Sequence, residues 1–502
     1  MASRVLLLTP ARRFIANRSG LGYQIPLGLV LLGGPLLDAG HEVRLIDNDL
    51  HGWDAERLIK EVRRFRPDYL LMGHTGSTAA HGTCIENARF LKAAFPELRI
   101  VYGGVYPSYA AESTLRSCAA IDVVVRGEGE AIVVDLLHAW AHGLSLATVD
   151  GITWRDGETI CANRPRAAAQ DLDAFRPGWE LVEWERYQLF GMGRSAGMQY
   201  SRGCPLTCTH CGQWGFWKRW RHRSPDNVVA ELRTLAEKYG VKIVWFADES
   251  FAADQEVVIT LLEKLVQANL GLSLNVNMTA ADVVRDADLL PLYKAAGVDY
   301  VIMGIEALDD AIVQAVRKNN PVEISRAAIR ALRQNNIVAW ANIIYGLEDE
   351  TFSSMWEKFC NISALDPDFL NAVYLTPHFW TAAGRATDPR DVIQTDMSKW
   401  TYRNQVIATP HLAPWQLFLG VKLTEMGVHL RPHSLKRLLW HGDATIRKLM
   451  RRSLVAGTFS VAAELWEFFF DTTFAPRGTI SELPGVPART IRPSVSPGSP
   501  AP

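Results

Sequence analysis

The sequence predicts an α/β fold with two successive parallel sheets, followed by a region of helices alone. Three observations lead to this class. Short apolar segments alternate with helical segments over residues 1–145 and again over 191–400, whereas only helical periodicity remains over 401–473. Strands that alternate with helices form parallel sheets covered on both faces. We therefore expect two α/β domains joined by a linker at 146–190.

In the first domain, five apolar segments are expected to be strands because each ends at a glycine, a proline or a polar residue. Helical segments lie between them, which is typical of a doubly wound sheet of the flavodoxin or Rossmann type. Ligands of such sheets bind beyond the carboxyl ends of the strands. The five segments are Arg4–Leu8, Glu42–Ile46, Tyr69–Met72, Ile100–Tyr102 and Asp122–Val125.

The loops at this edge of the sheet are candidates for holding a ligand. Glycine and small hydroxyl residues allow a backbone to approach a large flat molecule or its phosphate-bearing tail. Taken alone, the loops could serve a nucleotide or a cobalamin, or could be tight turns. No G-x-G-x-x-G follows the first strand, which weakens a dinucleotide interpretation. The candidate residues are Ser77, Thr78, Gly103, Gly104, Glu128 and Gly129.

Three cysteines follow the first strand of the second domain. Cys204, Cys208 and Cys211 have the spacing C-x3-C-x2-C. Three thiolates can hold three irons of a [4Fe–4S] cluster and leave the fourth iron open to a small chelating molecule. Zinc is the alternative, with His210 as a fourth ligand, although structural zinc sites usually pair their cysteines differently.

The second domain is expected to be a partial barrel of six β/α units. Its strand ends carry polar residues, and barrel active sites lie at the carboxyl ends of the strands. The cysteine loop follows the first of these strands. The six predicted strands are Met198–Ser201, Lys242–Ala247, Ser273–Met278, Tyr300–Ile305, Val338–Tyr345 and Phe369–Leu375.

Composition limits the partners and the compartment. The chain has 502 residues, and its formal net charge of −1 gives no electrostatic reason to expect a nucleic acid. Its seven cysteines do not look like a disulfide framework, which favours a reducing cytoplasm. No transmembrane segment is expected, but Trp, Phe and Arg in the C-terminal helices allow peripheral membrane contact. Residues 474–502 are rich in Pro, Ser and Gly, which predicts a disordered tail.

The chain resembles the cobalamin-binding subclass of the radical S-adenosylmethionine (SAM) enzymes, because the cysteine loop follows the first strand of a six-unit barrel behind a five-strand domain. Within that subclass it resembles the anaerobic magnesium-protoporphyrin IX monomethyl ester cyclase family. The stretches that carry this likeness are HTGSTAAH, IVYGGVYPSY, CGQWGFWKRWRHRSP, ADVVRDADLLPLYKAAGV and YLTPHFWTAAGR. The stretch VRKNN (316–320) departs from it, since a turn with glycine is expected there.

The resemblance implies three cofactors: a [4Fe–4S] cluster on the cysteines, SAM on the open iron, and cobalamin on the loops of the first domain. For SAM it implies Asp248 and Glu249 at the amino group, although either could instead cap a helix. Asn275 and Asn277 share one strand face and could bind ribose or satisfy backbone groups. The remaining candidates are Glu306, the preferred carboxylate for SAM, and Asn342.

The resemblance also implies oxidative ring closure on a magnesium tetrapyrrole ester, with oxygen from water and an electron donor such as flavodoxin or ferredoxin. A cobalamin-dependent radical methyltransferase is the alternative enzyme, and a non-catalytic cofactor binder is the third hypothesis. Basic residues could bind the carboxylates of a tetrapyrrole or form a solvated rim. They are His378, Arg385, Lys218, Arg219, Arg221 and Arg223.

Overall fold

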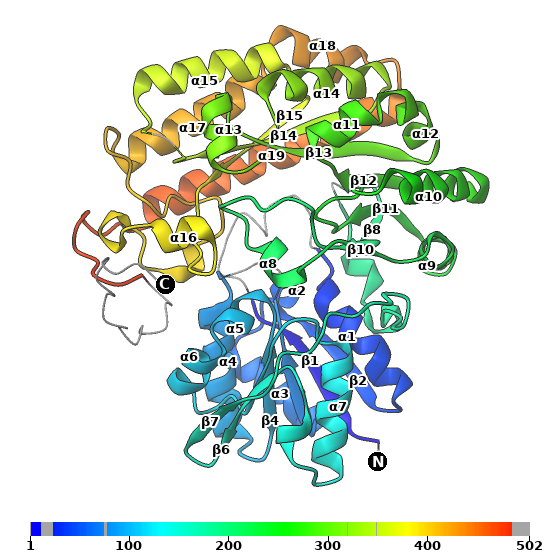
Figure 1. Cartoon of the computed structure of the whole chain (residues 1–502), viewed down its shortest axis with the longest axis vertical. Helices are drawn as coiled ribbons and strands as arrows, with labels where there is room; N and C mark the ends of the chain where they lie inside the picture. Colours follow the sequence, from blue (N-terminus) through cyan, green and yellow to red (C-terminus); the bar gives the residue numbers. More distant parts are fainter. Residues whose placement is uncertain are drawn as a thin grey trace, which may run out of the picture.

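The computed structural model describes residues 2–11, 24–74, 78–189, 191–318, 320–347 and 349–483. Figure 1 shows two α/β parts stacked one above the other, with the short helix α8 (Gln213–Trp217) between them. The N-terminal part lies below, and the barrel with the C-terminal helices lies above. The predicted fold class is therefore confirmed.

The N-terminal sheet has seven strands in the order β2-β1-β3-β4-β5-β6-β7. All five predicted strands are present and pair in parallel, each within one or two residues of its expected bounds. They are β1 (Arg4–Thr9), β2 (Glu42–Asp47), β3 (Tyr69–Met72), β4 (Arg99–Gly103) and β5 (Val123–Val125).

These strands read as continuous apolar runs because both faces of the sheet are covered. Neighbouring residues of a strand point to opposite faces. Leu7 of β1 belongs to one apolar cluster, with Val30 of α1 (Leu27–Asp38). Leu6 belongs to another, with Leu58 of α3 (Ala55–Phe65). The further helices of this domain are α2 (Asn48–His51), α4 (His81–Ala94), α5 (Val105–Tyr109), α6 (Ala111–Ser117) and α7 (Glu130–Ala141).

The N-terminal sheet extends into the expected linker. β6 (Ile152–Asp156) pairs antiparallel with β5, and β7 (Thr159–Ala162) pairs antiparallel with β6. Residues 152–162 therefore form a hairpin that covers the edge of the sheet, whereas the sequence predicts a linker over 146–190. The hairpin was missed because only Gly151–Trp154 has clear strand character in the sequence.

The barrel sheet is fully parallel, in the order β15-β14-β13-β12-β11-β8. Five of its six strands match the prediction closely. The first strand is wrong by several residues: it is β8, and the predicted Met198–Ser201 begins where β8 ends. The strands are β8 (Arg194–Met198), β11 (Val241–Phe246), β12 (Ser273–Asn277), β13 (Val298–Glu306), β14 (Val338–Tyr345) and β15 (Phe369–Tyr374).

The helices α9–α15 alternate with these strands, and their buried residues form one continuous core with the outward-facing strand residues. They are α9 (Pro225–Glu237), α10 (Gln255–Ala268), α11 (Ala280–Arg285), α12 (Leu290–Ala295), α13 (Asp310–Ala315), α14 (Val322–Gln334) and α15 (Phe352–Leu365). The short helix α16 (Ala382–Ala386) follows β15.

The C-terminal helices are α17 (Pro414–His429), α18 (Pro432–Trp440) and α19 (Ala444–Phe470). Within the region of helical periodicity, the segments Ala444–Leu454 and Val461–Phe470 have the clearest helical pattern, and the structure joins them into the single helix α19. The chain beyond it packs back on the barrel side, since the Ala475 amide donates to the Ile393 carbonyl at 2.8 Å. The described part of the expected tail, 474–483, is thus in contact with the fold.

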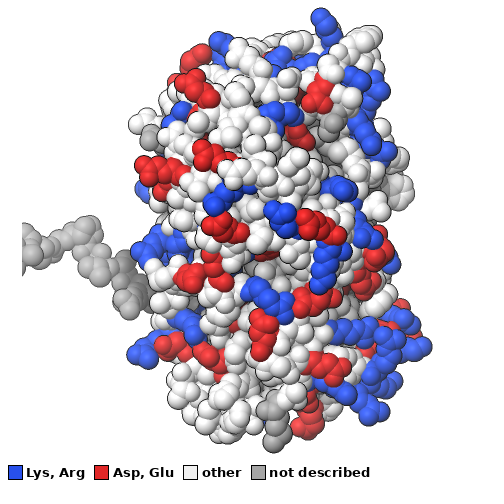
Figure 2. All heavy atoms as spheres, turned by 90° about the vertical axis from the view of Figure 1, so that its right-hand side faces the viewer, with Lys and Arg blue, Asp and Glu red and all other residues white. Residues whose placement is uncertain are grey.

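Surface charge follows the neutral composition. On the face in Figure 2, Lys and Arg side chains intermingle with Asp and Glu over most of the surface. A surface that binds nucleic acid has its Lys and Arg side chains clustered on one face.

Candidate functional site

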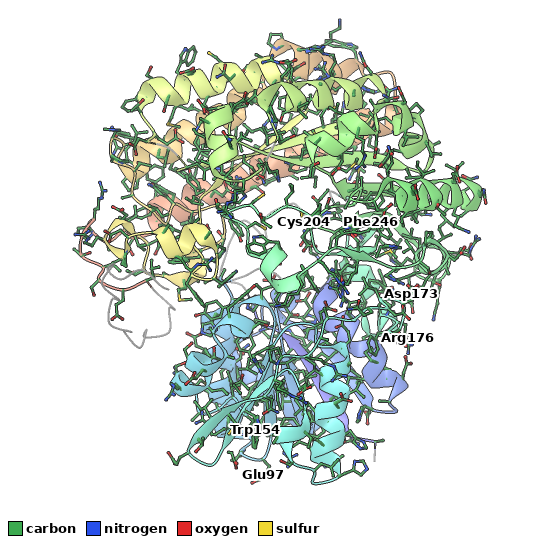
Figure 3. The ribbon with its side chains drawn as sticks, viewed as in Figure 1. Glu97, Trp154, Asp173, Arg176, Cys204 and Phe246 are labelled. Carbon is green, nitrogen blue, oxygen red and sulfur yellow. The ribbon has the colours of Figure 1, made fainter. Side chains whose placement is uncertain are left out.

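The cysteine loop lies between the two sheets. Cys208 is buried, and Cys204 and Cys211 are partly buried. Figure 3 shows Cys204 on the barrel side of this junction, far from Glu97 and Trp154 at the lower end of the N-terminal domain. The loop leaves the sheet after β8, and its first residues form β9 (Ser201–Arg202), which pairs with β10 (Arg221–His222).

Asp248 fixes the start of this loop. Its buried carboxylate accepts hydrogen bonds from the Tyr200 amide at 3.2 Å and the Ser201 hydroxyl at 2.5 Å. Burial raises the pKa of Asp248 to about 7, and these hydrogen bonds oppose the rise. The Ser201 amide also donates to this carboxylate, so β8 ends early because the amides of Tyr200 and Ser201 bind a side chain instead of extending the strand.

A buried ammonium group faces the three thiols. Burial raises the pKa of the Cys208 thiol to about 11, and the Lys318 ammonium opposes that rise. Burial also raises the pKa values of Cys204 and Cys211, and the Lys318 ammonium opposes the rise there as well. A cation at this position favours thiolates, which are the form that binds metals.

Glu306 is paired with this lysine. Lys318 Nζ lies 2.9 Å from Glu306 Oε1, and the His210 Nε2 atom lies 4.0 Å from the same oxygen. Burial opposes ionisation, but Lys318 and His210 together hold the pKa of Glu306 below its usual range. Gly304 makes this arrangement possible, because a Cβ there would come within 2.2 Å of Glu306 Oε1.

Glu249 presents an acceptor with no protein partner. Its Oε1 accepts a hydrogen bond from Trp217 Nε1 at 2.8 Å, while its Oε2 is buried without a hydrogen-bond partner. Burial raises the pKa of Glu249 to about 7. Neither Asp248 nor Glu249 caps a helix: the cap of α10 is Asp254, which accepts from the Val257 amide.

The asparagines on the inner strand faces have different surroundings. Asn277 donates to the Asp248 carbonyl at 2.9 Å, so it satisfies backbone as the second interpretation expected. Asn342 accepts from the Asn371 amide at 3.2 Å. In contrast, Asn275 Oδ1 is buried without a partner, and so is Nε1 of Trp245, its neighbour across the β11–β12 pair.

A cavity of about 230 Å³ opens over the carboxyl edge of the N-terminal sheet. Gly103, Gly104, Glu128 and Gly129, four of the candidate residues, line it, and Trp217 of α8 lines it from the barrel side. Gly104 adopts a φ of +122°, a region that favours glycine. Ser77 lies outside the described residues.

Two predicted residues of this edge are engaged across the domain junction. Thr78 Oγ1 lies 2.9 Å from His378 Nδ1 and does not line the cavity. Glu128 lines the cavity, but its oxygens are paired with Arg202 at 2.9 Å and Arg221 at 2.5 Å. Both residues therefore connect the N-terminal domain to the barrel.

Several residues of the expected basic rim are buried and already paired. Arg221 binds Glu128, and Arg223 binds Glu231 at 2.6 Å. His378 is buried between Thr78 and the Tyr402 hydroxyl, and burial lowers its pKa to about 3. These three residues are thus not a solvated rim, because their polar groups already bind partners within the protein.

Lys318 is a site residue that the sequence did not reveal. It lies in VRKNN, the stretch where a glycine-containing turn was expected, and that departure is the only signal in the sequence.

Among the described residues, no group of three or more His, Cys, Asp or Glu side chains is placed to hold a metal ion.

Comparisons with known proteins identify the two α/β parts. Residues 15–137 match the B12 binding domain, and residues 198–359 match the radical SAM superfamily. The chain is 38% identical over 485 residues to the anaerobic magnesium-protoporphyrin IX monomethyl ester cyclase of Synechocystis, covering 96% of this chain and 97% of the relative. The chain belongs to this family of cobalamin-binding radical SAM enzymes.

Two further comparisons agree with this radical SAM enzyme family. The cyclase of Rubrivivax gelatinosus is 30% identical over 438 residues, which cover 86% of this chain and 77% of the relative. The radical SAM methyltransferase TsrM of Kitasatospora setae, solved with cobalamin and a [4Fe–4S] cluster bound, matches with a TM-score of 0.69. That match covers 92% of this chain and 100% of TsrM at 16% identity.

The enzyme uses a [4Fe–4S] cluster, SAM and cobalamin, and the described residues fit these groups. The three cysteines supply the ligand type of a cluster with one open iron, although their side chains are not gathered into a metal site among the described residues. The free oxygens of Glu249 and Asn275 are acceptors for the ammonium and hydroxyl groups of a ligand. The glycine-lined cavity lies against the N-terminal sheet, where glycines allow a ligand to approach the backbone closely.

Proposed function

We propose that this radical SAM enzyme closes the fifth ring of magnesium-protoporphyrin IX monomethyl ester to give protochlorophyllide, without O2 and with oxygen from water. The observation that carries the proposal is the 38% identity to a cyclase over nearly the whole of both chains. We infer that a small electron-transfer protein such as flavodoxin or ferredoxin supplies electrons, and that the enzyme works in the cytoplasm.

In this proposal Cys204, Cys208 and Cys211 hold the cluster. When bound, the cluster and SAM supply hydrogen-atom abstraction from an unactivated carbon, which no protein side chain can perform. Lys318 favours the thiolate form of the three ligands. Asp248 keeps the loop that carries them in place through its hydrogen bonds to Tyr200 and Ser201.

Of the residues expected to contact SAM, we propose that Glu249 and Asn275 do so. We assign the amino group to Glu249, because its Oε2 is buried and has no partner in the protein. We assign a ribose hydroxyl to Asn275 for the same reason. Glu306 acts through Lys318, to which it is already bound, so it positions that cation beside the cysteines.

Cobalamin is proposed to lie against Gly103, Gly104 and Gly129, beneath α8. Phe216 and Trp217 of that helix line the same cavity, so they separate the cobalamin from water on the barrel side. Trp217 also donates to Glu249, which links the proposed cobalamin and SAM sites through one indole ring.

The test is an anaerobic incubation of the reconstituted full-length enzyme with the porphyrin ester, SAM and a reductant. Ring closure is expected to produce protochlorophyllide, measured by its absorption spectrum and by mass. A product heavier by one methylene would assign a methyltransferase instead. Cofactor binding without 5′-deoxyadenosine formation would assign a non-catalytic binder.

Cys208→Ala is the matched variant. It removes one thiolate ligand, so the visible absorption of the cluster and all turnover should be lost, while cobalamin stays bound. Cys360→Ala is the control, since Cys360 is exposed and distant from the loop in the chain. Turnover that persists in Cys208→Ala would contradict the assignment of the cluster ligands.

A further inference from the structure

Helix α19 turns its apolar side outward. Val455, Phe459, Ala462, Trp466 and Phe470 follow one another at spacings of four, three, four and four residues and form one stripe along the helix. Phe459, Trp466 and Phe470 are exposed by 60%, 58% and 72%. By length and composition, Ile446–Phe470 is apolar enough to cross a membrane. Only 28% of its apolar 18-residue stretch is buried inside the protein, so most of that stretch faces outward.

The polar side of the same helix is buried and fixed by ion pairs. Glu464 binds Arg403 at 2.8 Å and Lys422 at 2.5 Å. Glu467 binds Lys399 at 2.5 Å. A rotation of the helix that hid the aromatic stripe would break these buried pairs, and an unpaired buried charge is costly. The outward stripe is therefore a fixed feature of the fold.

Helix α17 adds a second stripe beside the first. The rings of Phe418 and Phe468 stack at 4.1 Å, and Lys422 reaches Glu464, so the two helices run side by side in opposite directions. Between them lies an apolar cavity of about 410 Å³ that both helices line. The second stripe consists of Trp415, Leu419, Leu423, Met426 and Leu430.

The charge of this region indicates which partner covers it. Residues 411–471 contain five carboxylates: Glu425, Glu464 and Glu467 are buried, Asp443 is partly exposed, and the exposed Asp471 is paired with Lys399 at 2.7 Å. Lys436 and Lys448 are exposed around the stripes, and so are Arg451 and Arg452, which also donate to the backbone carbonyls of Leu438, Leu439 and Gly191. A surface with outward aromatic rings and outward cations, whose one exposed carboxylate is already paired with a lysine, matches an anionic lipid surface.

We propose that α17, α18 and α19, which pack together on the barrel in Figure 1, dock this enzyme onto an anionic bilayer. α19 lies flat in the membrane interface, with its aromatic stripe among the lipid chains and its cations at the headgroups. It does not span the bilayer, because Glu464 and Glu467 tie its other side to the barrel. The proposal is independent of the substrate.

The test is flotation of the full-length enzyme with vesicles of equal parts phosphatidylglycerol and phosphatidylcholine. The enzyme should float with these vesicles, bind far less to pure phosphatidylcholine, and be partly released by salt at about 0.5 M. The variant Phe459→Ser/Trp466→Ser/Phe470→Ser should lose vesicle binding by about tenfold or more. All three side chains are exposed, so its circular dichroism should match that of the unaltered enzyme.

Leu144→Ser/Val266→Ser is the matched control, because both side chains are exposed apolar residues away from the C-terminal helices. It should float like the unaltered enzyme. Two results would overturn the proposal. One is an enzyme that stays in solution with anionic vesicles. The other is a dimer, seen by light scattering, that the triple variant abolishes while no vesicle binding occurs, since the stripe would then belong to a second copy of the chain.

Discussion

At the scale of single residues, the cysteine loop is packed without spare room on its C-terminal side. A Cβ on Gly212 would lie 2.1 Å from Nε1 of Trp380. Trp380 cannot move aside easily, since it stacks on His378 at 4.7 Å and on Tyr109 at 5.2 Å. The loop is therefore held by rings from both domains.

Gly212→Ala should destabilise the enzyme by about 1–3 kcal/mol, because the added methyl group forces Trp380 off its partners. Gly82→Ala is the control: nothing lies within 4 Å of a Cβ there, so the change should be neutral or stabilising by about 0.5 kcal/mol. Urea midpoints measured anaerobically compare the two. Equal midpoints would show that the Trp380 ring is not fixed.

Trp217 donates the side-chain hydrogen bond that Glu249 Oε1 accepts, beside backbone hydrogen bonds to the same carboxyl from Gly203 and Glu249. Trp217→Phe keeps the ring but removes the hydrogen bond, so 5′-deoxyadenosine formation should slow by about tenfold, mainly through a higher KM for SAM. Trp415→Phe, at an exposed position, should leave the rate unchanged. A fall in kcat with an unchanged KM would contradict a role in positioning the SAM ligand.

At the scale of elements, the open edge of the barrel is closed by side chains. β15 is the last strand, and an unpaired edge invites pairing with another chain. Here the Leu370 amide donates to His429 Nε2 at 3.2 Å, and the Ala372 amide donates to Glu425 Oε1 at 3.2 Å. Glu425 also binds Arg403 and Lys422, so the edge, α17 and α19 share one buried network.

Glu425→Ala should cost about 3 kcal/mol or more of the free energy of unfolding, because it leaves buried cations without part of their counter-charge. Glu425→Gln keeps an acceptor for the Ala372 amide and should cost less. Glu237→Ala breaks only the exposed pair with Arg233 and should cost less than about 0.5 kcal/mol. Chemical unfolding of the three variants checks the order, and a Glu425→Ala protein as stable as Glu237→Ala would contradict it.

At the scale of the whole molecule, a neutral histidine joins the two domains. His378 of the barrel side meets Thr78 of the N-terminal domain, and burial lowers the pKa of His378 from 6.5 to about 3. The unfolded chain thus binds a proton at a higher pH than the folded one does. The stability from this group is complete above pH 6.5 and is lost as the pH falls toward 3.

We therefore expect the enzyme to lose about 2 kcal/mol of stability between pH 6.5 and pH 5 through His378 alone. Burial lowers the pKa of His81 to about 4, which adds to the loss with the same sign. His378→Gln should flatten part of this slope, whereas His411→Gln, at an exposed position, should not. Urea unfolding across the pH range measures both, and identical slopes would exclude the His378 contribution.

Local pattern was enough for much of the fold. Ten of the eleven predicted strands lie where their apolar runs indicated, because a buried parallel strand must be apolar on both faces. The exception, Met198–Ser201, failed because the carboxylate of Asp248, far along the chain, accepts hydrogen bonds from the amides of Tyr200 and Ser201. The two helical segments of α19 join because the sequence gives no stop signal at 455–460 strong enough to end the helix.

The cluster motif and the order of strands and helices could be predicted from the residues alone, since both depend on residues close together in the chain. Which polar groups are already bound became clear from the three-dimensional arrangement. Asp248 holds a loop, Glu128 binds two arginines and Glu306 binds Lys318, whereas Glu249 and Asn275 keep acceptors free. It also decided that α19 faces outward with its aromatic side. These outcomes depend on partners distant in the chain, and the periodicity of a segment shows an apolar face without showing what that face meets.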